Sequence, residues 1–325
     1  MTGGPVQDPV EAFARATGHR SGRPEVWAWI AFLLLFSLIG LFIYLGLRPG
    51  GTGPVIAYSI GRDLIGLAAV ATGFFGVLWS LLHRPLLRRR RLPAFLALAV
   101  VIGTHAYPFP YPSSYEGHPS ATCFRLPVEG EWTVVWGGES KDTNRLAGFL
   151  PERRWGIDLI VTLDGRDHDG DGLKLEDYYA YGRDVLAPAG GRVVRVHSGQ
   201  RDTQPGMIDR GLEPYGNHVV IEIAPKEFLF LAHLQPGSIG VREGEVVEAG
   251  QPLARVGNSG FSALTPMPHL AIHLQDTPEP RLGEPIPWRF CGYVADGRPV
   301  DEGLPVGRIG RDGGFYGQRV TQLPQ

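Results

Sequence analysis

An uncharged apolar run of 22 residues, Val26 to Leu47, constrains this chain more than any other feature. About 20 apolar residues are enough to cross the hydrocarbon core of a bilayer as a helix. The run is too long for an ordinary buried helix and too long for a signal peptide, and two further apolar runs follow it. We therefore predict three transmembrane helices, at about 26–47, 64–82 and 92–107. The third is only about 16 residues long, with Pro93 near its start.

The distribution of arginine predicts how these helices are oriented. The short loop 83–91 carries five arginines, whereas the loop 48–63 carries only Arg48 and Arg62. Positively charged loops stay in the cytoplasm. We expect a multi-pass protein of the cytoplasmic membrane with a cytoplasmic N-terminus (1–25). If the third run spans, all residues after about 110 are extracytoplasmic.

The remainder of the chain reads as a Pro-rich linker followed by a β-rich domain. Proline restricts its own φ and favours an extended predecessor, so residues 108–120 are predicted to form a stiff spacer. From 121 to 325, short β-type runs alternate with glycine-rich turns, and no convincing amphipathic helix appears. The predicted strands are Glu131–Trp136, Trp155–Thr162, Gly191–His197, His218–Ala224, Glu227–His233, Pro252–Val256 and His269–Leu274. The expected fold class is mostly β, an antiparallel sheet or sandwich. A net charge of -2 gives no indication of a nucleic-acid partner.

Four ordered segments of this domain resemble the lysostaphin-type (LytM-like) zinc metallopeptidases. They read YGRDVLAPAGGRVVRV, YGNHVVIEI, FLFLAHLQPGSIGVREGEVVEAGQPLARVGNSG and MPHLAIHLQD. The resemblance covers roughly 130 to 290 and implies a fold of the duplicated hybrid motif type. It also implies a zinc site that hydrolyses peptide bonds in peptidoglycan, where three protein ligands leave one position for water.

Mapped onto this sequence, the family pattern is incomplete. Asp158 matches the aspartate ligand, and His233 and His269 match two histidines that assist catalysis. The first ligand position holds Arg154, whose guanidinium is expected to compete with a cation for Asp158, and to form an ion pair there instead. Ala271 stands where the last histidine ligand should be.

Three further residues are candidates for the same groove. His273 faces the same side of its strand as position 271 but stands about 6.6–6.8 Å further along, which argues against it as a zinc ligand. His218, with its neighbour Asn217, lines the groove or is an ordinary strand histidine.

The segment VREGEVVEAGQPLARVGNSG alone also resembles biotinyl and lipoyl carrier domains. Those domains need a lysine at a hairpin tip, and none of the three lysines lies in this segment.

Two other features bear on cofactors and stability. Asp167, Asp169 and Asp171 match the start of a calcium loop, but the closing glutamate is absent, so we expect a solvated loop without tight calcium binding. Cys123 and Cys291 are the only cysteines. Because an exported domain lies in an oxidising compartment, they are expected either to form a disulfide or to remain as two buried thiols.

The sequence therefore predicts a membrane-anchored, catalytically impaired relative of the zinc peptidases, with no bound zinc. Its expected partner is peptidoglycan or a cell-wall hydrolase that it regulates. The alternative is a working metalloendopeptidase with an unusual ligand set.

Overall fold

The computed structural model describes residues 26–46, 48, 50–83, 89–106, 111–140, 142–148, 150–209, 213–262, 264–311 and 313–323. The chain divides into two compact units, one of residues 1–41 and 63–106 and one of residues 42–62 and 107–325. The predicted cytoplasmic N-terminus, residues 1–25, lies outside the described residues. So do Arg84 and Arg88, the two arginines of the loop 83–91 that precede Arg89.

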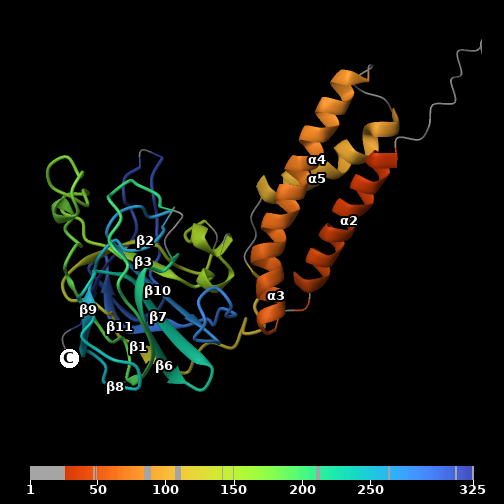
Figure 1. Ribbon diagram of the computed structural model, residues 1–325. Coiled ribbons are helices and arrows are strands. Elements are labelled where there is room, and N and C mark those ends of the chain that lie inside the picture. The colour runs from red at the N-terminus through yellow and green to blue at the C-terminus, as the bar shows by residue number, and fades with distance from the viewer. Residues whose placement is uncertain are drawn as a thin grey trace, which may run out of the picture. The chain divides into compact units, whose positions relative to one another are not determined.

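The N-terminal part is helical, as Figure 1 shows. Its elements are α2 (Val26–Gly46), α3 (Thr52–Ile56), the π-helical turn η1 (Ala57–Gly61), α4 (Arg62–Leu82), η2 (Arg89–Arg91) and α5 (Leu92–Ala106). Glycines permit close packing here: Trp27 of α2 and Phe95 of α5 both lie against Gly76 of α4.

Two helical stretches, Val26–Tyr44 and Thr52–Leu82, are long and apolar enough to cross a membrane, while Leu92–Gly103 is a shorter apolar helix. Many of their large apolar side chains are exposed, including Leu33, Leu67 and Phe74. The second helix begins at Thr52, twelve residues before the predicted start at 64, because α3 and η1 continue directly into α4.

The C-terminal part is built on an eleven-stranded sheet with the order β1-β11-β13-β2-β3-β10-β7-β6-β5-β8, where β12 pairs with β11; β4 and β9 form a separate pair. The strands are β1 (Cys123–Phe124), β2 (Trp132–Trp136), β3 (Ile157–Ile160), β4 (Asp184–Leu186), β5 (Gly191–His197), β6 (Asn217–Ala224), β7 (Glu227–Leu234), β8 (Val246–Val247), β9 (Pro252–Arg255), β10 (Leu270–Gln275), β11 (Arg289–Ala295), β12 (Arg298–Gly303) and β13 (Arg319–Gln322). All seven predicted strands are present, with ends shifted by two residues at most.

The mostly β fold class is confirmed, but the sheet is mixed rather than purely antiparallel. The two-residue strand β1 runs parallel to β11, whereas the other pairs are antiparallel. This pair could not be predicted from the sequence, because so short a strand carries no alternation of its own and is defined by its partner.

Side-chain alternation gives the central strands two different faces. Leu159, Leu231 and Ile272 point into the main hydrophobic core. The intervening residues, among them Asp158, Phe230 and Ala271, point to the opposite face, as the two-residue period of a strand requires. The candidate site is built on this second face.

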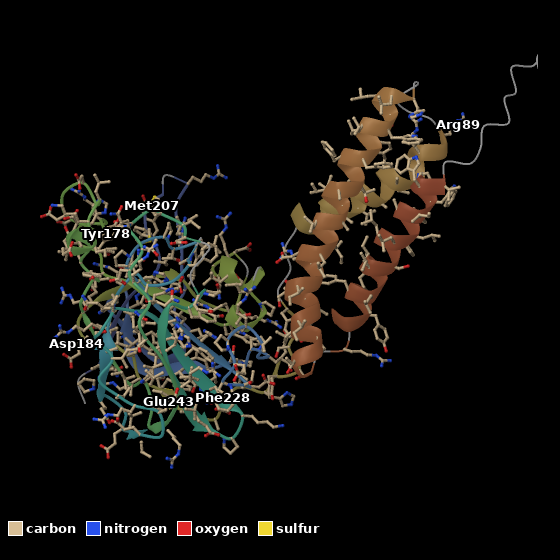
Figure 2. The ribbon with its side chains drawn as sticks, viewed as in Figure 1. Arg89, Tyr178, Asp184, Met207, Phe228 and Glu243 are labelled. Atoms are coloured by element: carbon tan, nitrogen blue, oxygen red, sulfur yellow. A yellow bond between two sulfur atoms is a disulfide. The ribbon has the colours of Figure 1, made fainter. Side chains whose placement is uncertain are left out.

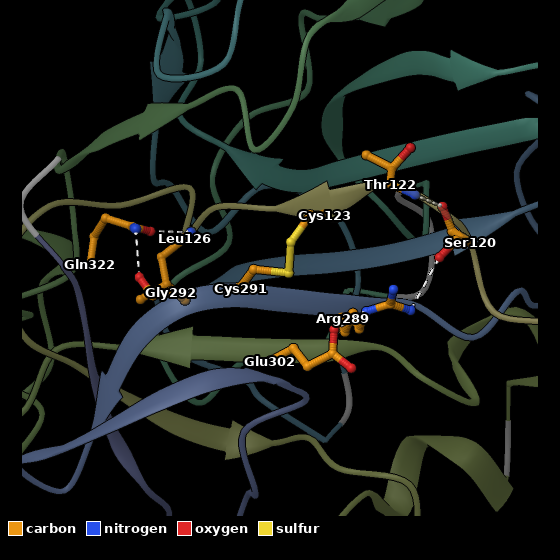
Figure 3. Close-up of a disulfide and its surroundings, with 9 residues drawn as sticks. All are labelled: Ser120, Thr122, Cys123, Leu126, Arg289, Cys291, Gly292, Glu302 and Gln322. Carbon is orange, nitrogen blue, oxygen red and sulfur yellow. Dashed lines mark hydrogen bonds and ion pairs between the residues drawn. A yellow bond between two sulfur atoms is a disulfide. The ribbon is translucent and has the colours of Figure 1, made fainter.

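Cys123 and Cys291 form a disulfide between β1 and β11, with their Cα atoms 5.7 Å apart (Figure 3). The described part of the predicted linker is bonded to the domain. The Ser113 hydroxyl donates to the Pro285 carbonyl at 2.7 Å, and the Ser114 hydroxyl donates to the Glu284 carboxylate at 2.8 Å.

Candidate functional site

Asp158 lies at the centre of the site, on β3 between β2 and β10. Its side chain is buried, and both carboxylate oxygens have partners. Arg153 donates to Oδ1 in an ion pair, and the Thr265 hydroxyl donates to Oδ2 at 2.7 Å. Trp136 in turn donates to the Thr265 oxygen at 3.1 Å. The single retained ligand of the family pattern is therefore fully engaged by this chain's own side chains.

The arginine that pairs with Asp158 is Arg153, so the expectation for Arg154 is wrong. Arg154 instead donates to the Tyr111 carbonyl and to Glu116, both at 2.6 Å, and its guanidinium lies 4.5 Å from the Trp155 ring centre. The cause is the short 3₁₀ turn η4 (Pro151–Arg153), which precedes β3 and directs consecutive side chains to different sides.

The pair between Arg153 and Asp158 is nearly inaccessible to water, with exposed side-chain fractions of 3% and 2%. Burial is the largest single influence on the pKa of the Asp158 carboxyl and raises it, but the Arg153 guanidinium, acting together with His269, the Thr265 hydrogen bond and His233, lowers that pKa overall. Asp158 is therefore ionised, and its charge is compensated within the protein.

His233 and His269 lie together beside Asp158, with ring centres 4.5 Å apart. Each Nδ1 donates to a backbone carbonyl, that of Ser259 at 2.8 Å and that of Met267 at 2.7 Å. A carbonyl can only accept, so the proton of each neutral ring is on Nδ1 and the lone pair is on Nε2. His233 occupies a left-handed backbone conformation, with φ of 64°.

Both rings are neutral near pH 7. Burial lowers the pKa of His233 to about 3, and it also lowers the pKa of His269 although Asp158 opposes the shift. The His269 Nε2 atom has no hydrogen-bond partner and lies 3.8 Å from Oδ2 of Asp158.

Ala271 occupies the position opposite Asp158 on β10, and it also pairs with Ala232 on β7. Its methyl group has no lone pair to offer a cation. His273, two residues along, stacks on Phe230 with ring centres 4.6 Å apart and bonds to Gln275 at 3.3 Å. Its contacts are therefore those of a packed core histidine, and burial lowers its pKa well below the usual value.

His218 lies further along the same face, on β6, with its ring centre 6.0 Å from that of Phe230, and Asn217 precedes it in the strand. The Asn217 amide joins two backbone segments by donating to the carbonyls of Gln200 and Leu234. His218 stacks on His197, with ring centres 5.2 Å apart and planes within 14°. Neither residue lines the pocket beside Asp158.

The residues at this site do not fit the zinc that the family pattern implies. One ligand position carries an arginine directed elsewhere, one carries alanine, and the third is neutralised by Arg153. Among the described residues, no group of three or more His, Cys, Asp or Glu side chains is placed to hold a metal ion. A cation would have to displace the Arg153 guanidinium from Asp158 first.

A pocket of about 320 Å³ opens beside the ion pair. Its walls are mainly apolar, and its polar lining includes three residues that the sequence did not single out, Glu152, Tyr215 and Arg281. The Tyr215 hydroxyl donates to the buried Glu152 carboxyl, whose pKa is raised by burial. Tyr215 stands in the quoted YGNHVVIEI segment, but nothing in the sequence indicated that it reaches Glu152.

Two further hollows lie near this pocket. His233 and Ser262 also line a second hollow, which contains Asn258, Ser259 and Gly260 but is too narrow for a water-sized group. That hollow shares Thr203 and Met207 with a third, of about 260 Å³. Figure 2 shows Met207 at the opposite end of the domain from Phe228 and Glu243.

The aspartate-rich loop uses its carboxylates to stabilise its own turns. Asp167 contacts the His168 ring at 2.7 Å, while Asp169 and Asp171 accept from the backbone amides of Gly170 and Leu173 at 2.9 and 3.1 Å. These contacts are those of a turn-forming segment.

Comparison with known proteins supports the predicted resemblance. Residues 171–281 match the model of peptidase family M23, which is about a third of the chain. The matched range contains His233, His269 and Ala271 but begins after Asp158. None of the curated proteins matches this chain.

Solved structures of such peptidases show low overall similarity to this chain. A zinc-containing peptidase from Vibrio cholerae is 21% identical, with a TM-score of 0.31, over 55% of this chain and 39% of that one. The catalytic domain of a prophage-encoded M23 protein from Enterococcus faecalis is 20% identical, with a TM-score of 0.31, over 50% and 94%. The catalytic domain of lysostaphin from Staphylococcus simulans is 17% identical, with a TM-score of 0.29, over 47% and 86%. The family resemblance rests on the match to residues 171–281.

Proposed function

Since residues 171–281 match peptidase family M23, we propose that the C-terminal domain is a non-hydrolytic relative of these peptidases. In this proposal it binds peptides of the cell wall in the pocket beside Asp158, on the outer side of the cytoplasmic membrane. The observation that carries the proposal is the buried ion pair between Arg153 and Asp158, which occupies the metal position while the pocket beside it stays open.

The chemistry of hydrolysis supports this reading. Cleaving a peptide bond at neutral pH requires water to be activated and the scissile carbonyl to be polarised. The two neutral histidines could accept a proton, but the Asp158 carboxylate, which a metal would need, is already paired with the Arg153 guanidinium. This pairing favours a site that holds a peptide over one that activates water. Binding to wall peptides, or regulation of another wall hydrolase through this pocket, needs no metal-activated water.

One observation favours a second candidate, a zinc peptidase with an unusual ligand set. The unpartnered His269 Nε2 lies 3.8 Å from Asp158, and His233 stands beside it, so three donors lie close together. A metal held there would use both histidines that the resemblance assigns to water attack. It would also require Arg153 to leave a buried carboxylate, which is costly.

Metal analysis and a wall-digestion assay on the purified full-length protein separate the two candidates. We expect well under one equivalent of zinc, no solubilisation of purified peptidoglycan, and retention of the protein on sedimented walls. Near-equimolar zinc together with digestion that is lost in Asp158→Ala would establish the second candidate. Failure to sediment with walls would refute the first.

A further inference from the structure

The pocket beside Asp158 has one charged side chain that forms no direct ion pair among the described residues. Arg281 lines the pocket, is exposed, and makes no hydrogen bond or ion pair within the described part of the chain. By contrast, the Arg153 charge in the same pocket is compensated by Asp158. Arg281 is also held in a left-handed backbone conformation, with φ of 63°, which is uncommon for a residue with a side chain.

Most of the remaining pocket wall is apolar. It is formed by Leu146, Leu150, Pro214, Phe261 and Leu264. The buried Glu152 carboxyl is hydrogen-bonded to the Tyr215 hydroxyl, and the Arg281 charge acts on it without a direct contact, opposing the larger effect of burial, which raises the pKa of Glu152. An apolar chamber with one unpaired guanidinium is complementary to a ligand that has an apolar group and an anionic end.

We propose that this pocket binds the free C-terminal carboxylate of a short peptide, with Arg281 on the carboxylate and the apolar walls around the last side chain. The proposal rests on the proposed function and gives it a substrate class. A carboxylate matches the planar fork of arginine, which can donate two parallel hydrogen bonds. A volume of about 320 Å³ is at the small end of ligand pockets, which suits one or two residues rather than a long chain.

The extent of the pocket limits how much of the peptide it holds. The hollow beyond His233 and Ser262 is too narrow for a water-sized group, so the peptide does not continue that way. The pocket therefore holds only the last residues of the peptide, with the carboxylate at Arg281. A peptide that continued beyond Arg281 would place an uncharged amide against the guanidinium.

Titration calorimetry on the full-length protein in detergent tests this with two probes, the tripeptide Ala-Ala-Leu and its C-terminal amide. We expect the free acid to bind about tenfold tighter or more, because it alone makes a charge-assisted hydrogen bond to arginine. Arg281→Gln should abolish the preference, and Arg281→Lys should retain part of it. Arg242→Gln, an exposed arginine outside all three hollows, is the matched control and should behave as the wild type.

Equal binding of the acid and the amide, or a preference that survives Arg281→Gln, would overturn the proposal. Wall sedimentation of the same variants distinguishes this from failure of the proposed function. If Arg281→Gln still sediments with walls and the tripeptides show no preference, only the carboxylate pocket is wrong. If the wild type does not sediment, the proposed function itself is wrong. Inorganic phosphate that competes as strongly as the tripeptide would assign Arg281 to anions in general, and would also overturn the proposal.

Discussion

At the scale of single residues, the site depends on which of two neighbouring arginines faces Asp158. Arg153 reaches the carboxylate, whereas Arg154 is held by Glu116 and the Tyr111 carbonyl. The family motif places Arg154 at the ligand position, but the arginine that contacts Asp158 is its neighbour Arg153. The direction of each side chain is decided by the 3₁₀ turn η4, which has no strong sequence signature.

This geometry predicts which substitutions restore a zinc site. We expect Arg153→His combined with Ala271→His to bind zinc, because it removes the guanidinium and adds imidazoles near the Asp158 carboxylate. The control, Arg154→His with Ala271→His, should not bind zinc, since Arg153 still occupies Asp158. Metal analysis after dialysis against zinc measures both. Zinc in the Arg154 pair and not in the Arg153 pair would contradict the assignment.

Buried neutral histidines predict an acid-sensitive domain. Burial lowers the pKa of His218 to about 4 from its ordinary 6.5. Between those values the unfolded chain binds a proton that the folded state does not. The free energy of unfolding is therefore highest above about pH 6.5 and falls as the pH drops toward 4. One such histidine contributes a slope of up to about 1.4 kcal/mol per pH unit.

Thermal unfolding of the full-length protein between pH 7 and pH 4 measures this. The midpoint should fall across the interval, and His218→Gln should make the fall shallower. His118→Gln, at an exposed histidine, is the control and should leave the slope unchanged. Parallel curves for the wild type and His218→Gln would show that His218 does not titrate in the way its burial implies.

At the scale of secondary structure, the longer apolar strands could be predicted from sequence and short edge strands could not. The strands β5, β6, β7 and β10 have 7, 8, 8 and 6 residues, and they are rich in valine, isoleucine, leucine or phenylalanine between glycine-containing turns. By contrast, β1 and β8 have two residues each, and β12 is largely polar. Such strands are specified by the partner that they pair with, which a local pattern does not reveal.

The same limit applies to the pocket. The family resemblance predicted that His233 and His269 lie in one site. By contrast, Glu152, Tyr215 and Arg281 come from three distant segments. Only tertiary packing places them together.

The disulfide ties one of these short strands to the sheet. Cys123 and Cys291 are separated by 168 residues, and the chain-entropy model gives about 4–5 kcal/mol for a loop of that length. We expect the protein purified from cells to show a mobility shift on a gel with reductant and no titratable thiol when unfolded without reductant. The double variant Cys123→Ser and Cys291→Ser should unfold at a lower temperature. Two free thiols in the unreduced protein would show that the bridge does not form in the cell.

At the scale of the whole molecule, the number of membrane crossings and the state of the two cysteines are linked. Both depend on the side of the membrane on which the C-terminal domain lies. The two long helices Val26–Tyr44 and Thr52–Leu82 together return the chain to its starting side if both cross. Only a third crossing, by α5, would place the C-terminal domain outside. At 15 residues, α5 is about 22 Å long, less than the roughly 30 Å hydrocarbon core. Short helices are accommodated by local thinning of the bilayer, at a modest cost per ångström.

We therefore predict three crossings, with the N-terminus inside and the C-terminal domain outside. A reporter active only outside, such as alkaline phosphatase, should be active at the C-terminus and inactive when fused after Arg91. A fluorescent protein that matures only inside should give the opposite pattern. The control replaces Arg88 to Arg91 with glutamine, which removes most of the charge that holds the loop inside. Both reporters on the same side of the membrane would exclude a crossing by α5. The two cysteines would then face a reducing compartment, so the same outcome should appear independently as two free thiols.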